Sequence, residues 1–218
     1  GRFVLFQSQA TNLAHGAPDP THDAYLHDLQ SGVTEMVSVN SSGVHAAGFN
    51  LATSISADGR YACFQSNAGN LAAGDTGFDY DIFVRDRMSG TTTIVSVDSA
   101  GVHGNDDSEV GVLSPDGRFV AFRSKATNLV PGDTNGEWDV FVHERQTGVT
   151  ERVNLGPGGA EAHGDSYTTS LSFDGRYVGR GDHEHQCNCD KYFSHVIPSF
   201  RSAARLPNVQ IEGRAAFG

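Results

Sequence analysis

Hydrophobic and polar residues alternate along short segments of the chain, and turns that contain glycine separate these segments. In the stretch 60–66, odd-numbered side chains would face one side of an extended strand and even-numbered side chains the other. The preceding Asp58-Gly59 pair is a strong hairpin signal. The pattern therefore predicts two antiparallel strands here, the first ending at 54–56 and the second covering 60–66.

This hairpin pattern recurs along the chain with a constant period. Close copies of the stretch 113–124 occur at 55–66 and 171–178 and, shortened, at 1–8, which places the turn glycine at Gly1, Gly59, Gly117 and Gly175. Two further strands follow in each unit, and no helical periodicity is found. The pattern is typical of an all-β β-propeller built from four-stranded antiparallel blades. The remaining expected strands are 80–86 and 91–97 in the second unit and 118–124, 138–144 and 149–155 in the third.

Three motifs of the third unit carry a family resemblance. They are Ser114-Pro-Asp-Gly-Arg-Phe-Val-Ala-Phe122, then Asp139-Val-Phe-Val142, and Thr147-Gly148 before a Thr- and Val-rich strand. Together they resemble the TolB-type, or WD40-like, β-propeller repeat, and the resemblance runs from Gly1 to about Val178. It implies a periplasmic or extracellular location. Because such propellers include scaffold proteins, peptidase side-domains and enzymes, it implies no single function.

The number of units predicts an incomplete ring. The blades occupy 1–178, with units that start near residues 1, 59 and 117. A closed propeller needs roughly four to eight blades. An open array would leave unpaired strand edges, which invite pairing with another chain. We therefore expect an incomplete ring that self-association completes, and we expect further residues before Gly1 because the chain begins at a second strand.

The last segment, 179–218, departs from the repeat. Gly179-Arg-Gly-Asp182 replaces the expected continuation of the second strand. One interpretation is a divergent fourth blade, because 190–195 echoes 139–143 and 211–217 echoes 56–64. The other is a non-native tail, because Ile211-Glu-Gly-Arg214 is also the recognition sequence of a protease used to remove tags. Both interpretations stay open.

Charge excludes some partners. The chain carries 15 basic and 26 acidic residues, a formal net charge of −11. A nucleic acid or an anionic membrane surface would require the opposite sign. No run of about 18 apolar residues is present, so no membrane-spanning segment is expected. For a propeller that acts as a binding module, the expected partner is then a protein or a glycan.

One loop has the oxygen-rich pattern of a cation site. Asp133, Asn135, Glu137 and Asp139 alternate around a glycine, and calcium takes about six to eight oxygen ligands. The alternative is an Asx-turn loop, in which Asp and Asn side chains bond to their own backbone without a metal. Asp23 and Asp81 share the position of Asp139 in their units, so we also expect a structural aspartate in every blade.

A second candidate metal site lies in the divergent segment. His183, His185, Cys187 and Cys189 would share one face of a strand, and their nitrogen and sulfur donors suit zinc or copper. The alternative is a tail that binds no metal. Residues two apart on a strand diverge too little to surround a tetrahedral ion easily, and zinc sites more often use a Cys-x-x-Cys spacing.

Catalytic motifs are weak. The chain has no Gly-x-Ser-x-Gly elbow, His-Glu-x-x-His motif or phosphate loop. His45 and His103 recur at one repeat position, where Glu161 stands in the third unit, and recurrence favours a packing or surface role. The leading hypothesis is a binding or scaffold module that presents a face or axial funnel to a partner. The alternative is a hydrolase or lyase that acts on a carbohydrate or ester at the propeller axis.

Overall fold

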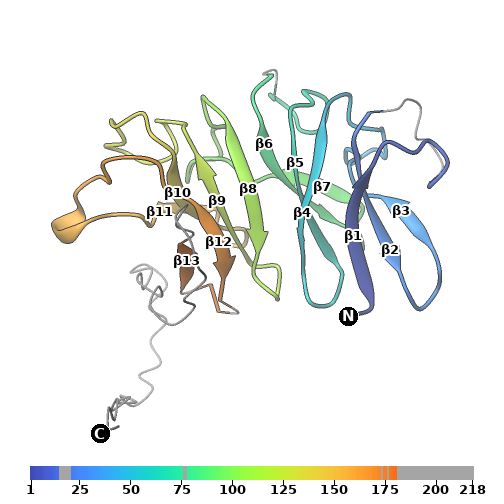
Figure 1. The fold of residues 1–218 in the computed structure, drawn as a ribbon. Helices are drawn as coiled ribbons and strands as arrows, with labels where there is room; N and C mark the ends of the chain where they lie inside the picture. Colours follow the sequence, from blue (N-terminus) through green and yellow to red (C-terminus); the bar gives the residue numbers. More distant parts are fainter. Residues whose placement is uncertain (15–20, 76–77, 173, 176, 181–218) are drawn as a thin grey trace, which may run out of the picture.

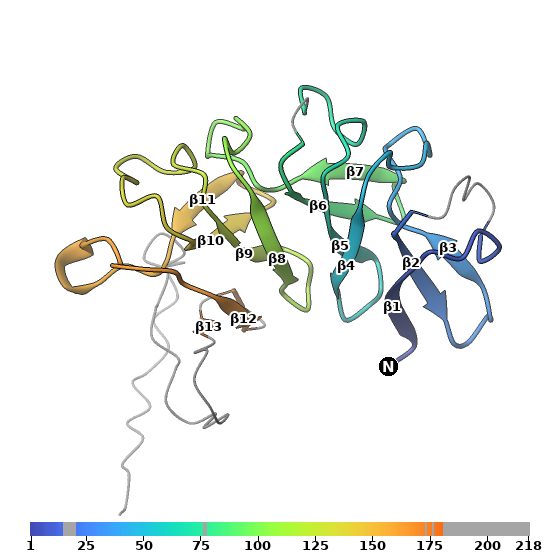
Figure 2. The same ribbon diagram turned by 45° about the horizontal axis from the view of Figure 1, so that its top comes forward.

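The protein is an array of antiparallel sheets set side by side as blades. The computed structural model describes residues 1–14, 21–75, 78–172, 174–175 and 177–180. Their sheets follow one another around an open arc (Figures 1 and 2). The arc confirms a β-propeller architecture with an incomplete ring, and self-association stays a prediction. Among these residues, no helix is long and apolar enough to cross a bilayer.

Two complete blades stand between a three-stranded blade and a hairpin. Blade one consists of β1 (Phe3–Ser8), β2 (Asp23–Asp28) and β3 (Thr34–Met36). Blade two consists of β4 (Asn50–Ile55), β5 (Tyr61–Ser66), β6 (Asp81–Asp86) and β7 (Thr91–Ile94). Blade three consists of β8 (Ser108–Leu113), β9 (Phe119–Ser124), β10 (Asp139–Glu144) and β11 (Val149–Arg152). A short 3-10 helix, η1 (Pro157–Gly159), precedes the fourth unit, which contains β12 (Thr168–Leu171) and β13 (Val178–Arg180).

The turn between the first and second strands explains the recurring Ser-x-Asp-Gly sequence. In blade two, the Ser56 hydroxyl donates to Asp58 over 2.6 Å, and Asp58 accepts the Arg60 amide over 2.9 Å. Gly59 has φ +71°, a conformation that L side chains disfavour. Ser114 and Asp116 repeat these contacts in blade three. The hairpins predicted from this motif are confirmed.

The second strands of blades two and three, β5 and β9, are buried on both faces, because these blades lie between two neighbouring units. Ala62 and Phe64 on β5 pack in the cluster shared with blade one. Cys63, between them in sequence, packs in the cluster shared with blade three. The predicted alternation of faces is thereby confirmed. Burial raises the pKa of the Cys63 thiol to about 11, so this cysteine acts as a small apolar side chain.

The fourth strands end earlier than the sequence predicts. They were expected to reach 97 and 155, but β7 ends at Ile94 and β11 at Arg152. After Ile94 the chain turns Ser96 inward, where its hydroxyl donates to Asp81 over 2.6 Å. Asn154 likewise donates to Asp139. The last three residues expected in each of these strands therefore leave the sheet and supply a hydrogen bond to the buried aspartate of the third strand.

Arginine side chains join blades two and three to the blade that precedes each of them. Arg145 follows β10, donates to the backbone carbonyl of Gly117 over 2.6 Å and stacks on the ring of Tyr61, 4.3 Å from its centroid. Arg87 makes the equivalent contacts in blade two, with the carbonyl of Gly59 and the ring of Phe3. These arginines hold the aromatic ring of the preceding blade against the turn of their own blade.

Candidate functional site

The loops that follow each second and fourth strand lie at one end of the blades, which we call the loop-bearing face (Figure 1). The loop predicted to bind calcium is on this face. Asn135 Nδ2 donates to Asp139 Oδ2 over 3.0 Å, and Asn135 Oδ1 accepts the backbone amide of Glu137 over 3.0 Å. The Asx turn of the alternative interpretation is therefore present. Asp133 is buried beside Asp139, whereas Glu137 is exposed.

A guanidinium group stands among the carboxylates of this loop. Arg152 Nη1 lies 3.1 Å from Asp133 Oδ1, 2.8 Å from Asp139 Oδ2 and 2.9 Å from Glu161 Oε1. Burial raises the pKa of Asp133. Hydrogen bonds from Thr134 and from Arg152 lower the pKa of Glu161 to about 2. Within the described ranges, no group of three or more His, Cys, Asp or Glu side chains is arranged to hold a metal ion. Calcium binding at this loop stays a prediction.

Comparison of the blades shows what Arg152 does. The aspartate at the start of the third strand is buried in all three blades, and the expected structural aspartate is confirmed by its hydrogen bonds. In blade one its side-chain partner is His45, whose Nε2 lies 2.9 Å from Asp23 Oδ1. In blade three Arg152 takes over this pairing, and Glu161, at the repeat position of His45, pairs with Arg152 instead. These residues compensate a buried charge.

Blade two accommodates its buried aspartate, Asp81, in a different way. Asp81 accepts a hydrogen bond from Ser96, but burial, together with the nearby charges of Asp75, Asp79 and Asp107, raises its pKa to about 7. At neutral pH this carboxyl group is therefore close to its titration midpoint. Protonation of Asp81 is therefore coupled to folding.

Stability is accordingly expected to fall as the pH rises from about 4 to about 7, by up to about 1.4 kcal/mol per pH unit from this residue. The folded chain retains the Asp81 proton over that interval, whereas the unfolded chain, whose carboxyl titrates near 3.8, has released it. Asp81→Asn mimics the protonated side chain and should remove this contribution. Urea unfolding of both proteins at about pH 5 and about pH 7 measures it. An identical pH dependence in both proteins would refute the assignment.

The histidine of the third strands has a packing role in the blades where it occurs. His143 Nδ1 lies 2.9 Å from the Thr150 hydroxyl, which itself donates to the carbonyl of Val97 over 2.5 Å. Burial, aided by the charge of Arg145, lowers the pKa of His143 to about 4. His27 makes the matching contact with Thr34. A neutral, buried imidazole of this kind stabilises the contact between blades.

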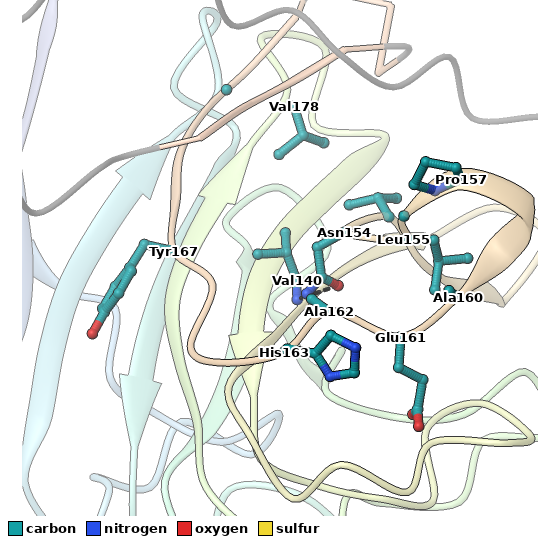
Figure 3. Close-up of a pocket in the computed structure, with 13 residues that line it drawn as sticks. Val140, Asn154, Leu155, Pro157, Ala160, Glu161, Ala162, His163, Tyr167 and Val178 are labelled. Atoms are coloured by element: carbon teal, nitrogen blue, oxygen red, sulfur yellow. Dashed lines mark hydrogen bonds between the residues drawn. The ribbon is translucent and has the colours of Figure 1, made fainter.

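A cavity of about 480 Å³ lies between blade three and the fourth unit, with Val140, Val153 and Val178 among its apolar residues (Figure 3). Glu161 and His163 lie at the opposite end of the cavity from Val178.

A set of aromatic residues runs along the loop-bearing face. His22, Tyr80 and Trp138 each stand directly before a third strand, at the same position of successive repeats. The carbonyls of His22 and Tyr80 accept the first amide of the next blade's first strand, over 2.9 and 2.6 Å. The Trp138 carbonyl accepts the amide of Ser166 in the fourth unit over 2.7 Å. These backbone bonds place the three rings at the same level of successive blades.

Two further rings complete this set. The Phe49 ring lies 4.7 Å from that of His22 and 6.2 Å, edge to face, from that of Tyr80. Tyr167 and Trp138 both contact the guanidinium of Arg123, at 4.8 and 4.5 Å from their ring centroids. Phe49 is 36% exposed, and the other four rings are partly exposed. We call His22, Phe49, Tyr80, Trp138 and Tyr167 the aromatic row.

Hydrogen-bonding groups alternate with the rings of the aromatic row. Asp107 accepts the Tyr80 amide over 2.8 Å, and Asp165 accepts the Trp138 amide over 3.2 Å. Arg123 also donates to Glu109 over 2.5 Å, so its charge is compensated. The result is a surface on which aromatic rings and carboxylates follow one another from blade to blade.

Sequence reasoning missed the aromatic row, although part of its signal was present. Tyr80 and Trp138 recur at one repeat position beside the predicted calcium ligands, which drew the interpretation to the acidic positions. Arg123 lies on β9 and Tyr167 directly before β12, so they meet only when neighbouring units pack. The second predicted metal site, at His183, His185, Cys187 and Cys189, lies outside the described residues.

Comparisons with known proteins show the fold. No model of a protein family and no curated protein matches the chain. The structure of a putative TolB from Agrobacterium tumefaciens is similar, with a TM-score of 0.53 and 17% identity over 83% of this chain and 50% of that one. TolB from Acinetobacter baumannii gives a TM-score of 0.46 and 21% identity over 77% of this chain and 34% of that one. The chain thus spans half and about a third of these proteins, and its fold is that of a TolB-type β-propeller.

Proposed function

We propose that the chain is a binding module whose loop-bearing face holds a partner along the aromatic row. The observation that carries this proposal is the placement of partly exposed rings at one level of three successive blades. Aromatic side chains supply large contact areas at low cost in conformational entropy, and they are enriched in recognition surfaces. A protein or a glycan is the partner class, and a location outside the cytoplasm stays a prediction.

Two titratable side chains, Glu161 at the cavity and His143 on β10, favour binding over catalysis. A hydrolase or lyase needs an accessible group that exchanges a proton near neutral pH, and Asp81, whose pKa is raised to about 7, is buried. Glu161 is held by Arg152 and Thr134, and its lowered pKa keeps it ionised. The buried His143 has a pKa of about 4 and bonds to Thr150. Both side chains are held in hydrogen bonds to neighbouring residues of blade three.

Trp138 is the only tryptophan of the sequence and stands in the aromatic row, so its fluorescence reports on this surface directly. Titration with oligosaccharides and peptides is expected to give a saturable change in fluorescence without product formation. Turnover of an ester or a glycan that is lost in Glu161→Gln or in His163→Ala would instead support the hydrolase or lyase alternative. A panel without any saturable change would remove the support for a binding surface here.

A further inference from the structure

We propose, building on the binding function above, that the aromatic row is a site for a neutral oligosaccharide chain. The rings recur at a common level from blade to blade, and Phe49 contacts the rings of both His22 and Tyr80, so the row extends over several blades. A single small molecule would cover only part of this row. An extended polymer of similar units meets this geometry.

The carboxylates between the rings determine which hydrogen-bonding groups the ligand needs. Asp107 and Asp165 each hold one backbone amide of the row, and Asp79 and Asp165 are exposed. A carboxylate accepts hydrogen bonds and donates none. The ligand must therefore carry hydrogen-bond donors beside an apolar surface that lies on the rings. A sugar ring has this combination, because its hydroxyl groups surround a face of C–H bonds.

The overall charge disfavours an anionic ligand. Arg123 is paired with Glu109, and Lys125, whose Nζ lies 5.4 Å from the centroid of the Trp138 ring, adds one positive charge beside the row. The formal net charge of the chain is −11, and acidic side chains surround the row. A uronic acid polymer or a nucleic acid strand would be repelled, although nucleic acid bases stack on such rings as well.

A proline-rich peptide is the nearest competing ligand, because extended proline-rich segments dock on aromatic grooves. Its backbone presents carbonyl acceptors, and proline has no amide N–H to donate. Such a peptide would leave Asp107 and Asp165 facing its carbonyl oxygens. The polar groups of the row thus favour the sugar.

The test measures binding of cellohexaose, chitohexaose, hexagalacturonate and decaproline by calorimetry and by Trp138 fluorescence. Binding of at least one neutral hexasaccharide is expected, with hexagalacturonate weaker. Tyr80→Ala should weaken that binding about tenfold, the usual scale for one stacked ring. Phe78→Ala is the matched control, because Phe78 is 89% exposed in the same loop but outside the row, and it should leave binding unchanged.

The possible outcomes separate the two proposals. Binding of decaproline alone, weakened by Tyr80→Ala, would overturn the oligosaccharide inference and leave the binding function standing. Tighter binding of hexagalacturonate than of the neutral sugars would overturn the charge argument. Equal affinities of Tyr80→Ala and Phe78→Ala, with both proteins folded by circular dichroism, would move the site away from the row. No response to any of the four probes would count against both proposals.

Discussion

Replacing Gly117 by alanine is expected to destabilise the array by about 2–5 kcal/mol. Gly117 has φ +70°, where a β-carbon costs about 1–2 kcal/mol. A Cβ atom built there lies 2.2 Å from Cδ2 of Tyr61 in the preceding blade, and overpacking of this kind costs about 1–3 kcal/mol more. The Tyr61 ring has little room to yield, because the guanidinium groups of Arg60 and Arg145 stack on it at 4.8 and 4.3 Å.

Gly148 supplies the control for this substitution. Its φ is +75°, but a Cβ atom built on it has no neighbour within 4 Å. Gly148→Ala should therefore show only the backbone cost of about 1–2 kcal/mol. Urea unfolding of the two variants separates the steric contribution from the conformational one. If both variants lose the same stability, the turn glycine does not act as a contact between blades.

The architecture could be read from the sequence because each signal that specifies it is local and repeated. The Ser-x-Asp-Gly turn joins positions close in sequence, and hydrogen bonds within the turn hold it. The buried aspartate of the third strand recurs at Asp23, Asp81 and Asp139, so its structural role followed from recurrence. The constant period of the repeat then made the blade assignment independent of any single motif.

The chemistry of the loop-bearing face was less predictable, because it depends on contacts between segments that the sequence separates. Arg152 on a fourth strand reaches Asp133, in the loop before the third strand, and Glu161, in the loop before the next unit. Only the packed blade brings these residues together. The sequence does show that two repeat positions change together: Met36 and His45 of blade one become Arg152 and Glu161 in blade three. Such a joint change is the pattern expected when one charge is introduced to balance another.

The aromatic row illustrates the same limit. Phe49 and Tyr80 precede the first and the third strand of one blade, while Trp138 and Tyr167 belong to neighbouring units. Periodicity places each ring near a strand end, but it does not say that the rings share a level. The backbone bonds from the carbonyls of His22, Tyr80 and Trp138 set that level.

Replacing Arg152 by methionine is expected to cost about 3–5 kcal/mol, because it leaves buried carboxylates without their cation. The side chain of Asp139 is 0% exposed and that of Asp133 is 4% exposed, so water cannot replace the guanidinium. Methionine preserves the packing of the aliphatic stem and is the natural residue at this position in blade one, Met36. Urea unfolding at neutral pH measures the loss.

A second substitution tests whether the loss arises from charge. Arg152→Met combined with Glu161→His recreates the pairing of blade one, in which His45 Nε2 lies 2.9 Å from Asp23. At about pH 6, where an introduced histidine carries charge, the double variant should recover part of the stability that the single variant lost. Recovery that is equal at about pH 6 and about pH 8 would point to packing instead of charge.

The parent chain and Arg152→Met together also test the calcium prediction for Asp133, Asn135, Glu137 and Asp139. In the parent chain a calcium ion would have to displace Arg152 from three carboxylates. In Arg152→Met those oxygens are free to coordinate a cation, and a bound ligand raises Tm by mass action. A rise in Tm on adding calcium to the variant alone would show that Arg152 holds the cation position. A rise in the parent as well would establish this loop as a calcium site despite the arginine.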